Sequence, residues 1–419
     1  MNAGIGPVPA VESVDLVEHA PAVSVPLPDV VGRALAAARI VDAAPNPYTP
    51  GRWSLRAGSK VGAVTVTAPG TGERVTVRVT PKVPVARLFF LLGHSLDPKG
   101  PWRDGQVSVA EHSEVLPALA HAVERQVDRA LRQGLLQGYR ATEETALVVR
   151  GRIREAEQIR RRFGMTLPVE VAYDEFTTDI AENRILRAAV ERLLRLPGVP
   201  REVRRRLSHQ RFRLADVSPI VRGQPLPGWQ PTRLNSRYHH ALHLACAVLD
   251  GASAEHAPGG LRVDGFLFDM NKLFEDFVTV ALREAFRGTG HTARLQDPHH
   301  LDSAAAIRMK PDFVLYGEDG VPCAVADAKY KAEKRDGYPD SDLYQMLAYC
   351  TALGLRDGHL VYAKGNASHA AHQVRHAGIL LHQHALDLDQ EPSALLADIA
   401  AVADRMTDAG IGTANTPRV

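Results

Sequence analysis

Two short apolar segments of this sequence end in charged residues that could act together. Asp312 opens the stretch 313–316, and Asp327 and Lys329 follow the stretch 323–326. The Gly-Glu-Asp-Gly segment between the two stretches is typical of a tight turn, so the spacing predicts a β-hairpin. Residues two apart on a strand share a face, and hairpin pairing would bring Asp312 alongside Asp327 and Lys329.

This combination suits metal-assisted hydrolysis of a phosphodiester. Two converging carboxylates are typical ligands of a hard cation, most simply Mg²⁺. Lys329 could stabilise the charge that develops on the phosphate, or position or deprotonate the attacking water. An isolated Asp-x-Lys also fits an exposed, salt-bridged strand end. The complete set in its element order is far more specific.

Two helices are expected to support the hairpin. The apolar period predicts a helix over 271–287, which carries Glu275 as a further acid for the metal site or its surroundings. A surface helix acid is the alternative for Glu275. A second helix over 342–353 carries Gln345 and Tyr349 four residues apart, hence on one face, where they could orient Lys329, water or a DNA backbone.

These residues resemble the PD-(D/E)xK nuclease superfamily, with Asp312, Asp327 and Lys329 at its central motif. The segment 345–349, QMLAY, is similar to the Q-x-x-x-Y element of the RecB-like branch. Further segments are together similar to McrC, the endonuclease subunit of the McrBC modification-dependent restriction system. They are GLLQGYR at 134–140, RGRI at 150–153, DIAENRIL at 179–186 and MNKLFEDFV at 270–278. This resemblance covers the chain from about residue 15 onward.

The resemblance implies a DNA endonuclease subunit that depends on Mg²⁺. Subunits of the McrC type act with McrB, an AAA+ motor that hydrolyses GTP, translocates double-stranded DNA and recognises methylated or hydroxymethylated cytosine. They bind the motor ring, stimulate its hydrolysis and cut the DNA. This sequence contains no G-x-x-x-x-G-K-[ST] phosphate loop, as expected of a non-motor subunit. The partner motor is therefore expected to be a McrB-like GTPase or ATPase.

The fold class expected from the whole chain is α+β with several domains. Residues 1–110 are expected to form a β-rich region, with a hairpin predicted from two segments that alternate at period two, 64–67 and 75–80. Residues 111–258 form a helical, arginine-rich region, with helices predicted over 115–131 and from Asp179, where Asp179 and Glu182 have capping-box spacing. Residues 259–419 are expected to form the nuclease domain, a mixed sheet flanked by helices. By the resemblance, the first two regions would dock on the motor.

Two other groups of residues leave alternatives open. The arginine runs at 160–162 and 204–206, with Arg211 and Arg213, suit phosphate contact, motor docking or a solvated helix face. Histidines gather at 239–240, at 299–300, and at His369, His372, His376, His382 and His384. We expect surface or packing roles for them, because members of the last group are predicted to point in different directions.

Composition sets outer limits on function. The 419 residues have a formal net charge of +2, so a nucleic-acid surface must be a local patch. Three cysteines without a C-x-x-C pair argue against a disulfide framework or a zinc module. No secretory leader or membrane span is evident, so we expect a cytoplasmic protein without a membrane partner.

Two rival functions remain open from the sequence. A free-standing repair nuclease would cut DNA without a motor. A non-catalytic activator would only dock on a motor and stimulate it, and would have no physical need for Asp312, Asp327 and Lys329.

Overall fold

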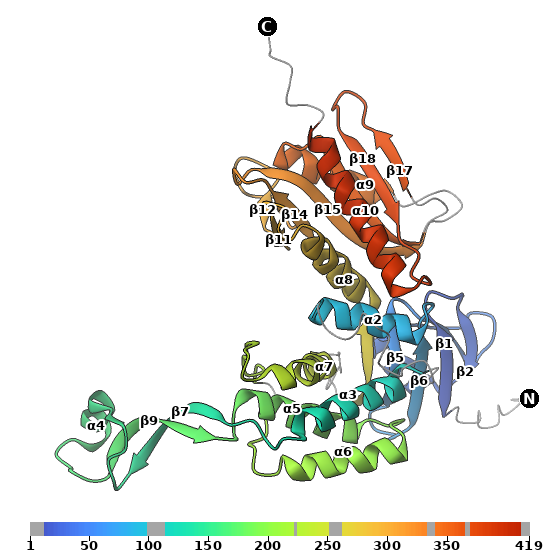
Figure 1. Ribbon diagram of the computed structural model, residues 1–419. Helices are drawn as coiled ribbons and strands as arrows, with labels where there is room; N and C mark the ends of the chain where they lie inside the picture. Colours follow the sequence, from blue (N-terminus) through green and yellow to red (C-terminus); the bar gives the residue numbers. More distant parts are fainter. Residues whose placement is uncertain are drawn as a thin grey trace, which may run out of the picture. The chain divides into compact units, whose positions relative to one another are not determined.

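The computed structural model describes residues 12–98, 114–221, 224–250, 262–332, 340–364 and 369–411 (Figure 1). Its contacts divide the chain into two compact units, Met1–Val115 with Ser253–Val419, and Leu116–Ala252. The first unit contains four sheets with their helices, and the second is helical with one long three-stranded sheet. The expected α+β class is therefore confirmed.

The N-terminal sheet of the first unit has the order β1-β6-β5-β10. Its strands are β1 (Ser13–Val17), β5 (Lys60–Thr67), β6 (Arg74–Thr80) and β10 (Arg262–Asp269). The predicted hairpin is confirmed, because β5 and β6 pair antiparallel with Val64 opposite Val77. β10 comes from far along the chain and pairs antiparallel with β5. A segment of the region that was expected to form the nuclease domain thus completes the N-terminal sheet as a strand that was not predicted, and the two units do not coincide with the three expected regions.

A smaller sheet and two helices complete the N-terminal part. The sheet has the order β2-β4-β3, formed by β2 (Val23–Pro26), β4 (Arg52–Arg56) and β3 (Asp42–Pro45). Helix α1 (Asp29–Ala38) contacts β3 and β5, and α2 (Val85–Leu96) packs on α8 (Met270–Ala285). Buried apolar side chains, Leu35 and Leu55 among them, form this core.

The sheet that carries the predicted hairpin is six-stranded and mixed, in the order β11-β14-β15-β16-β18-β17. The hairpin pairs β14 with β15 antiparallel, whereas β15, β16 and β18 run parallel to one another. Its strands are β11 (Thr292–Leu295), β14 (Phe313–Tyr316), β15 (Pro322–Ala332), β16 (Asp357–Lys364), β17 (His369–Gln373) and β18 (Leu380–Ala385). A two-stranded ribbon of β12 (His299–His300) and β13 (Arg308–Met309) lies in the β11–β14 connection.

Helices pack against this mixed sheet. α9 (Asp340–Leu353) contacts β15, β16 and β18. Met346, Tyr349 and Cys350 of α9 share a buried cluster with Val325, Leu360, Tyr362 and Leu381 of the strands. α8 and α10 (Pro392–Ile411) pack on each other and on β15. The predicted helices over 271–287 and 342–353 are therefore confirmed, with ends shifted by one or two residues.

The second unit is a helical body with a projecting arm (Figure 1). The body contains α3 (Val115–Leu131), α5 (Ala181–Arg195), α6 (Arg201–Arg213), a 3-10 turn, η2 (Ser236–Tyr238), and α7 (His239–Asp250). β7 (Gly138–Ala146) and β9 (Val169–Thr177) pair antiparallel along nine residues each and form the arm. β8 (Arg152–Ile153) and α4 (Glu155–Arg162) lie at its far end. Among the described residues, no helix has the length and apolar character needed to cross a membrane.

Candidate active site

The β14–β15 hairpin brings Asp312, Asp327 and Lys329 together. Phe313 pairs with Ala326, so the same register places Asp312 across from Asp327. Asp312 is almost fully buried, and its Oδ2 accepts a hydrogen bond from the backbone N–H of Ala328 at 3.0 Å. Lys329 forms an ion pair with Asp327, which is 2% exposed. The alternation of a strand places Asp327 and Lys329 on one face, as predicted.

Glu275 joins this group through Gln296, a residue that the sequence did not single out. The Gln296 side-chain amide donates to Asp312 Oδ1 at 2.9 Å and to Glu275 Oε1. The Gln296 backbone N–H also donates to the Asp312 carbonyl oxygen at 3.0 Å. Gln296 directly follows β11 with a positive φ of 52°, unusual for a residue with a side chain. These contacts favour a place for Glu275 beside Asp312 over the alternative of an ordinary acid on a surface helix.

Gln345 and Tyr349 lie on one face of α9, as expected from their spacing. The Gln345 amide donates to the Tyr349 hydroxyl at 2.7 Å. Tyr349 is buried, and burial together with the charges of Asp327 and Asp312 raises its pKa to about 12. Tyr349 is therefore a neutral phenol near the acids Asp312 and Asp327, and Gln345 is exposed beside it.

The electrostatics of the site are dominated by buried acids. Burial and the neighbouring Asp312 raise the pKa of Asp327 to about 6. Burial also raises the pKa of Asp312, with a further contribution from Glu275. The pKa of Glu275 is raised by burial and by Asp276 and Asp327. Burial alone would lower the pKa of Lys329, but the carboxylates of Asp327, Asp312 and Asp342 together outweigh it and raise that pKa.

The donor set fits a hard cation. Three carboxyl groups, from Glu275, Asp312 and Asp327, face a single ammonium group, so the ionised cluster has excess negative charge that a divalent cation would balance. Among the residues that the structure describes, no group of three or more His, Cys, Asp or Glu side chains has an arrangement that could hold a metal ion. Mg²⁺ keeps several waters and needs only one or two protein carboxylates, so an open site of this kind suits Mg²⁺ better than zinc.

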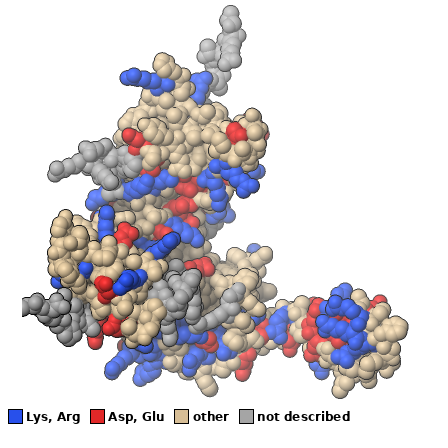
Figure 2. All heavy atoms as spheres, turned by 180° about the vertical axis from the view of Figure 1, so that it is seen from behind, with Lys and Arg blue, Asp and Glu red and all other residues tan. Residues whose placement is uncertain are grey.

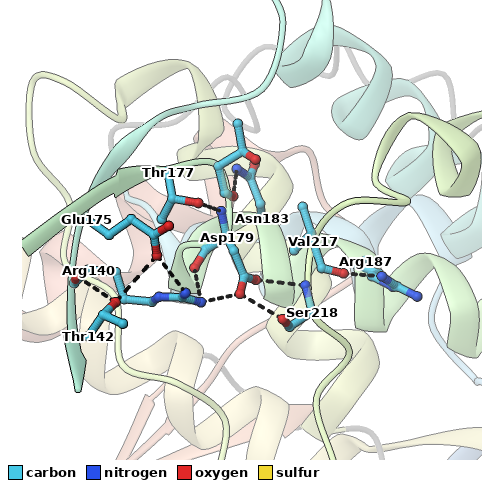
Figure 3. A network of polar contacts seen from close by, with 10 residues as sticks. Arg140, Thr142, Glu175, Thr177, Asp179, Asn183, Arg187, Val217 and Ser218 are labelled. Atoms are coloured by element: carbon cyan, nitrogen blue, oxygen red, sulfur yellow. Dashed lines mark hydrogen bonds and ion pairs between the residues drawn. The ribbon is translucent and has the colours of Figure 1, made fainter. Parts of the chain in front are cut away.

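A second polar network lies in the other unit, at the base of the arm (Figure 3). Arg140 of β7 forms ion pairs with Glu175 of β9, at 3.0 Å, and with Asp179. Asp179 also accepts hydrogen bonds from the backbone N–H and the hydroxyl of Ser218, each at 2.7 Å. Asn183 donates to the carbonyl oxygens of Leu136 and Thr178. Two segments of the stated resemblance, 134–140 and 179–186, thus meet in one network.

This network corrects one prediction about α5. Asp179 and Glu182 do not form a capping box, because α5 begins at Ala181 and its N-cap residue, Ile180, makes no side-chain capping bond. Asp179 instead holds Arg140 and Ser218. The capping-box pattern in the sequence coincided with a residue needed for a long-range contact.

The histidine prediction was also wrong in part. His369, His382 and His384 do not diverge but lie in one cluster with His359, because β16, β17 and β18 place them on one sheet face. His359 Nδ1 lies 3.0 Å from His384 Nε2, and the rings of His359 and His382 stack with centroids 4.7 Å apart. Burial holds the pKa of His384 down at about 3. A packing role for these side chains is consistent with this geometry.

The arginine runs are largely engaged within the chain. Arg204 donates to carbonyl oxygens at the end of α5, Leu194 and Leu196, and Arg213 donates to Leu131 at the end of α3. Helix C-termini leave carbonyl groups unpaired, which explains this use of arginine. Further ion pairs join Arg160 and Arg161 to Glu157, Arg162 to Glu170, and Arg206 to Glu124 and Glu202. Internal capping and pairing therefore account for most of the positive charge of these runs.

The whole described fold resembles a solved McrC-containing assembly. A chain in the half-complex of the tetradecameric assembly of Thermococcus gammatolerans McrB AAA+ hexamers with bound McrC superimposes with a TM-score of 0.55 at 16% identity. The match covers 94% of this chain and 100% of that one. A chain of the Thermococcus gammatolerans McrBC complex gives a TM-score of 0.39 at 18% identity, covering 65% of this chain and 88% of that one. At these identities the likeness concerns the fold.

The sequence comparison identifies the family. Residues 55–363 match the family described as McrBC 5-methylcytosine restriction system component. The match spans most of the chain, from β4 to β16, so this protein belongs to that family. No curated protein matches the sequence.

Proposed function

We propose that this chain is the Mg²⁺-dependent DNA endonuclease subunit of a McrBC-like restriction system. The observation that carries the proposal is the convergence of Glu275, Asp312 and Asp327 beside Lys329 in a sheet of the restriction-family fold. Buried acids with raised pKa values beside one ammonium are uncommon outside functional sites. Family membership and the described contacts together favour phosphodiester hydrolysis over a purely structural ion-pair cluster.

The residues divide the chemistry among themselves. Asp312 and Asp327 would hold Mg²⁺, with Glu275 as a third oxygen donor or a hydrogen-bonding neighbour. The bound ion would polarise the scissile phosphate and lower the pKa of its water. Lys329 would stabilise the charge that develops on the phosphate or orient the water. Gln345 and Tyr349 would position water or the DNA backbone from α9.

The proposed partner is a McrB-like AAA+ motor, since the structural neighbour comes from an assembly of McrB AAA+ hexamers with bound McrC. The motor would use GTP or ATP. The end of the arm is the surface that we propose for docking. Large apolar side chains are exposed there. Arginines gather at the same end, with acidic side chains among them (Figure 2). The apolar members are Leu147, Val148, Val149, Ile159, Phe163, Met165 and Leu167, exposed by 51–85%. Exposed apolar groups in such number favour a protein partner.

The substrate proposed for the assembled system is double-stranded DNA that carries methylated or hydroxymethylated cytosine. The motor would read the modified base, as the resemblance to McrC implies. This chain would supply cleavage and would stimulate the motor.

A plasmid cleavage assay with Mg²⁺ tests the catalytic part. The chain is combined with its motor and GTP or ATP on methylated and unmethylated DNA, with Asp327→Asn as the test variant. Asp319→Asn is the matched control, since Asp319 lies in the turn of the same hairpin and is exposed. We expect cleavage with motor and nucleotide that is lost in Asp327→Asn and kept in the control.

Other outcomes would replace the proposal. Cleavage by the purified chain without motor or nucleotide would indicate a free-standing nuclease. Stimulation of the motor without cleavage, unchanged in Asp327→Asn, would leave only an activator.

The docking part is tested separately by motor binding. Phe163→Asp places a charge in the exposed apolar end of the arm and should weaken binding at least tenfold, about 1.4 kcal/mol. Phe212→Asp is the control, because Phe212 is 77% exposed on α6 of the same unit, outside the arm. Equal binding by both variants would refute docking through the arm.

A further inference from the structure

The N-terminal part of the first unit contains a hollow of about 780 Å³ that the proposed catalytic residues do not use. It lies among the end of α1, β3, β4 and the start of β5. The residues around it are Ala22, Ala36, Arg39, Ile40, Val41, Asp42, Ala43, Ala44, Ser54, Arg56, Gly58, Ser59 and Lys60. Its size and composition raise the question of what it accommodates.

The hollow is positively charged. Arg39, Arg56 and Lys60 line it, against the single acid Asp42. In contrast to the arginines of α4 and to Arg206 of α6, none of the three cations forms an ion pair with a carboxylate among the described residues, although Arg56 lies opposite Asp42 in the β3–β4 register. Three like charges around one space repel one another, so a polyanion would bind there with a favourable electrostatic contribution.

The remaining side chains indicate which anion fits. Ser54 and Ser59 add hydroxyl groups, and the rest of the lining consists of alanine, glycine, valine and isoleucine. None of the described residues around the hollow is aromatic, so they offer no platform on which a base would stack. Small residues admit a backbone closely, and Arg, Lys and Ser are typical phosphate contacts that carry no sequence information.

The hollow adjoins the start of the helix that carries Glu275. Lys60 lies opposite Asp269, the residue that caps α8, in the β5–β10 strand register. The Ser59 carbonyl oxygen accepts a hydrogen bond from the Met270 N–H at 2.9 Å. Glu275 lies six residues beyond Asp269, about 9 Å along the helix axis. With one inter-strand spacing added, the backbones of Lys60 and Glu275 lie within about 15 Å, the rise of roughly four nucleotides.

We propose that this hollow holds the sugar-phosphate backbone of the DNA duplex, a few nucleotides from the phosphate that the carboxyl site cuts. The proposal rests on the proposed function, and it adds a sequence-independent contact made by this chain itself. The modified base would be read elsewhere, while Arg39, Arg56 and Lys60 hold the strand to be cut.

The test measures binding of the full chain to a fluorescein-labelled DNA duplex by anisotropy, without Mg²⁺ or motor. The variant Arg39→Gln/Arg56→Gln/Lys60→Gln is compared with Arg33→Gln. Arg33 lies on α1 outside the hollow and pairs with Asp29. Loss of three phosphate contacts should lower the slope of log K against log salt by about 3, whereas Arg33→Gln should leave it unchanged. Thermal melting verifies that the variants fold. The single variant Arg56→Gln, which perturbs the fold less, should lower the slope by about 1.

Any of three results would overturn the proposal. The triple variant could show the same affinity and salt slope as Arg33→Gln, or the wild-type chain could fail to bind the duplex at low salt. The third result is binding of inorganic phosphate without binding of the duplex. Failure of the proposed function is distinguishable, because it shows in the cleavage assay. Asp327→Asn should lose cleavage but retain full duplex binding. A wild-type chain that never cleaves, but loses DNA in the triple variant, would retain the contact and reject the endonuclease.

Discussion

A buried carboxyl group links the N-terminal sheet to the strand that carries the candidate site. Glu18 follows β1 and is completely buried. Its Oε2 accepts hydrogen bonds from the Tyr330 hydroxyl and from the Lys82 backbone N–H, each at 3.1 Å. Tyr330 is the neighbour of Lys329 on β15. A change in the protonation of Glu18 should therefore be felt in the stability of this unit.

The magnitude follows from the pKa of Glu18. Burial raises that pKa from 4.5 to about 7, and the bonds from Lys82 and Tyr330 only partly oppose it. A pKa that is higher in the folded than in the unfolded state contributes stability that is complete below pH 4.5 and lost as pH rises through 7. One pKa unit corresponds to about 1.36 kcal/mol, so ionised Glu18 costs the fold about 3 kcal/mol above pH 7.

The variant Glu18→Gln retains an acceptor oxygen for both donors but cannot ionise. We expect its free energy of unfolding to exceed that of the wild type by up to about 3 kcal/mol at pH 9, and to differ by less than about 1 kcal/mol at pH 5. Urea unfolding at the two pH values measures this difference. Glu73→Gln, at an exposed position, is the control. Equal destabilisation by Glu18→Gln at both pH values would refute the reasoning, since it would mean that the fold needs the carboxylate.

Three further predictions concern the rest of the fold. The pKa of His384 is about 3 in the folded state, against an ordinary 6.5. Between pH 7 and pH 5 the unfolded state takes up the proton and the folded state does not, so His384 should lower the free energy of unfolding by about 2 kcal/mol over this range. Acid unfolding of His384→Gln, which should lack this contribution, measures it. Arg140→Met should lower the free energy of unfolding by about 2 kcal/mol, because it leaves Asp179 without its cation. Hydrogen exchange should become faster in β7 and β9 but not in the first unit. Unchanged exchange in the arm would contradict this role. Gly62→Ala should lower the free energy of unfolding by more than about 3 kcal/mol, because φ is +135° and a Cβ would lie 2.3 Å from a carbonyl oxygen of β10. Gly70 also has a positive φ but lies in open space, so Gly70→Ala should be less destabilising. Thermal unfolding measures both variants.

The hairpin was predictable because its information is local. Asp312 opens an apolar stretch, Asp327 and Lys329 follow another, and the turn residues between them fix the register that sets the two acids side by side. The period-two alternation of β5 and β6 and the apolar period of α8 worked in the same way. In each case the partner lies within a few residues, and side-chain periodicity alone identifies the buried face.

Long-range pairing was not predictable from local pattern. The segment that forms β10 was not predicted as a strand and carries no mark of its partner, yet it pairs with β5 some 200 residues earlier. The prediction that the histidines diverge was wrong for the same reason. The parallel pairing of β16 with β18 aligns His359 with His382. Such alignments depend on which strands become neighbours, and a single sequence does not fix that.

Gln296 shows why the site itself was only partly predictable. Its position after β11 carries no motif, and an amide in a polar segment is ordinary in composition. Its role arises because the antiparallel β11–β14 pairing places it beside Asp312 while α8 brings Glu275 to the same point. The sequence can supply acids of the right type and spacing. Tertiary packing decides which neutral donor keeps two acids together, because such a donor needs only a side chain of the right length and a free N–H.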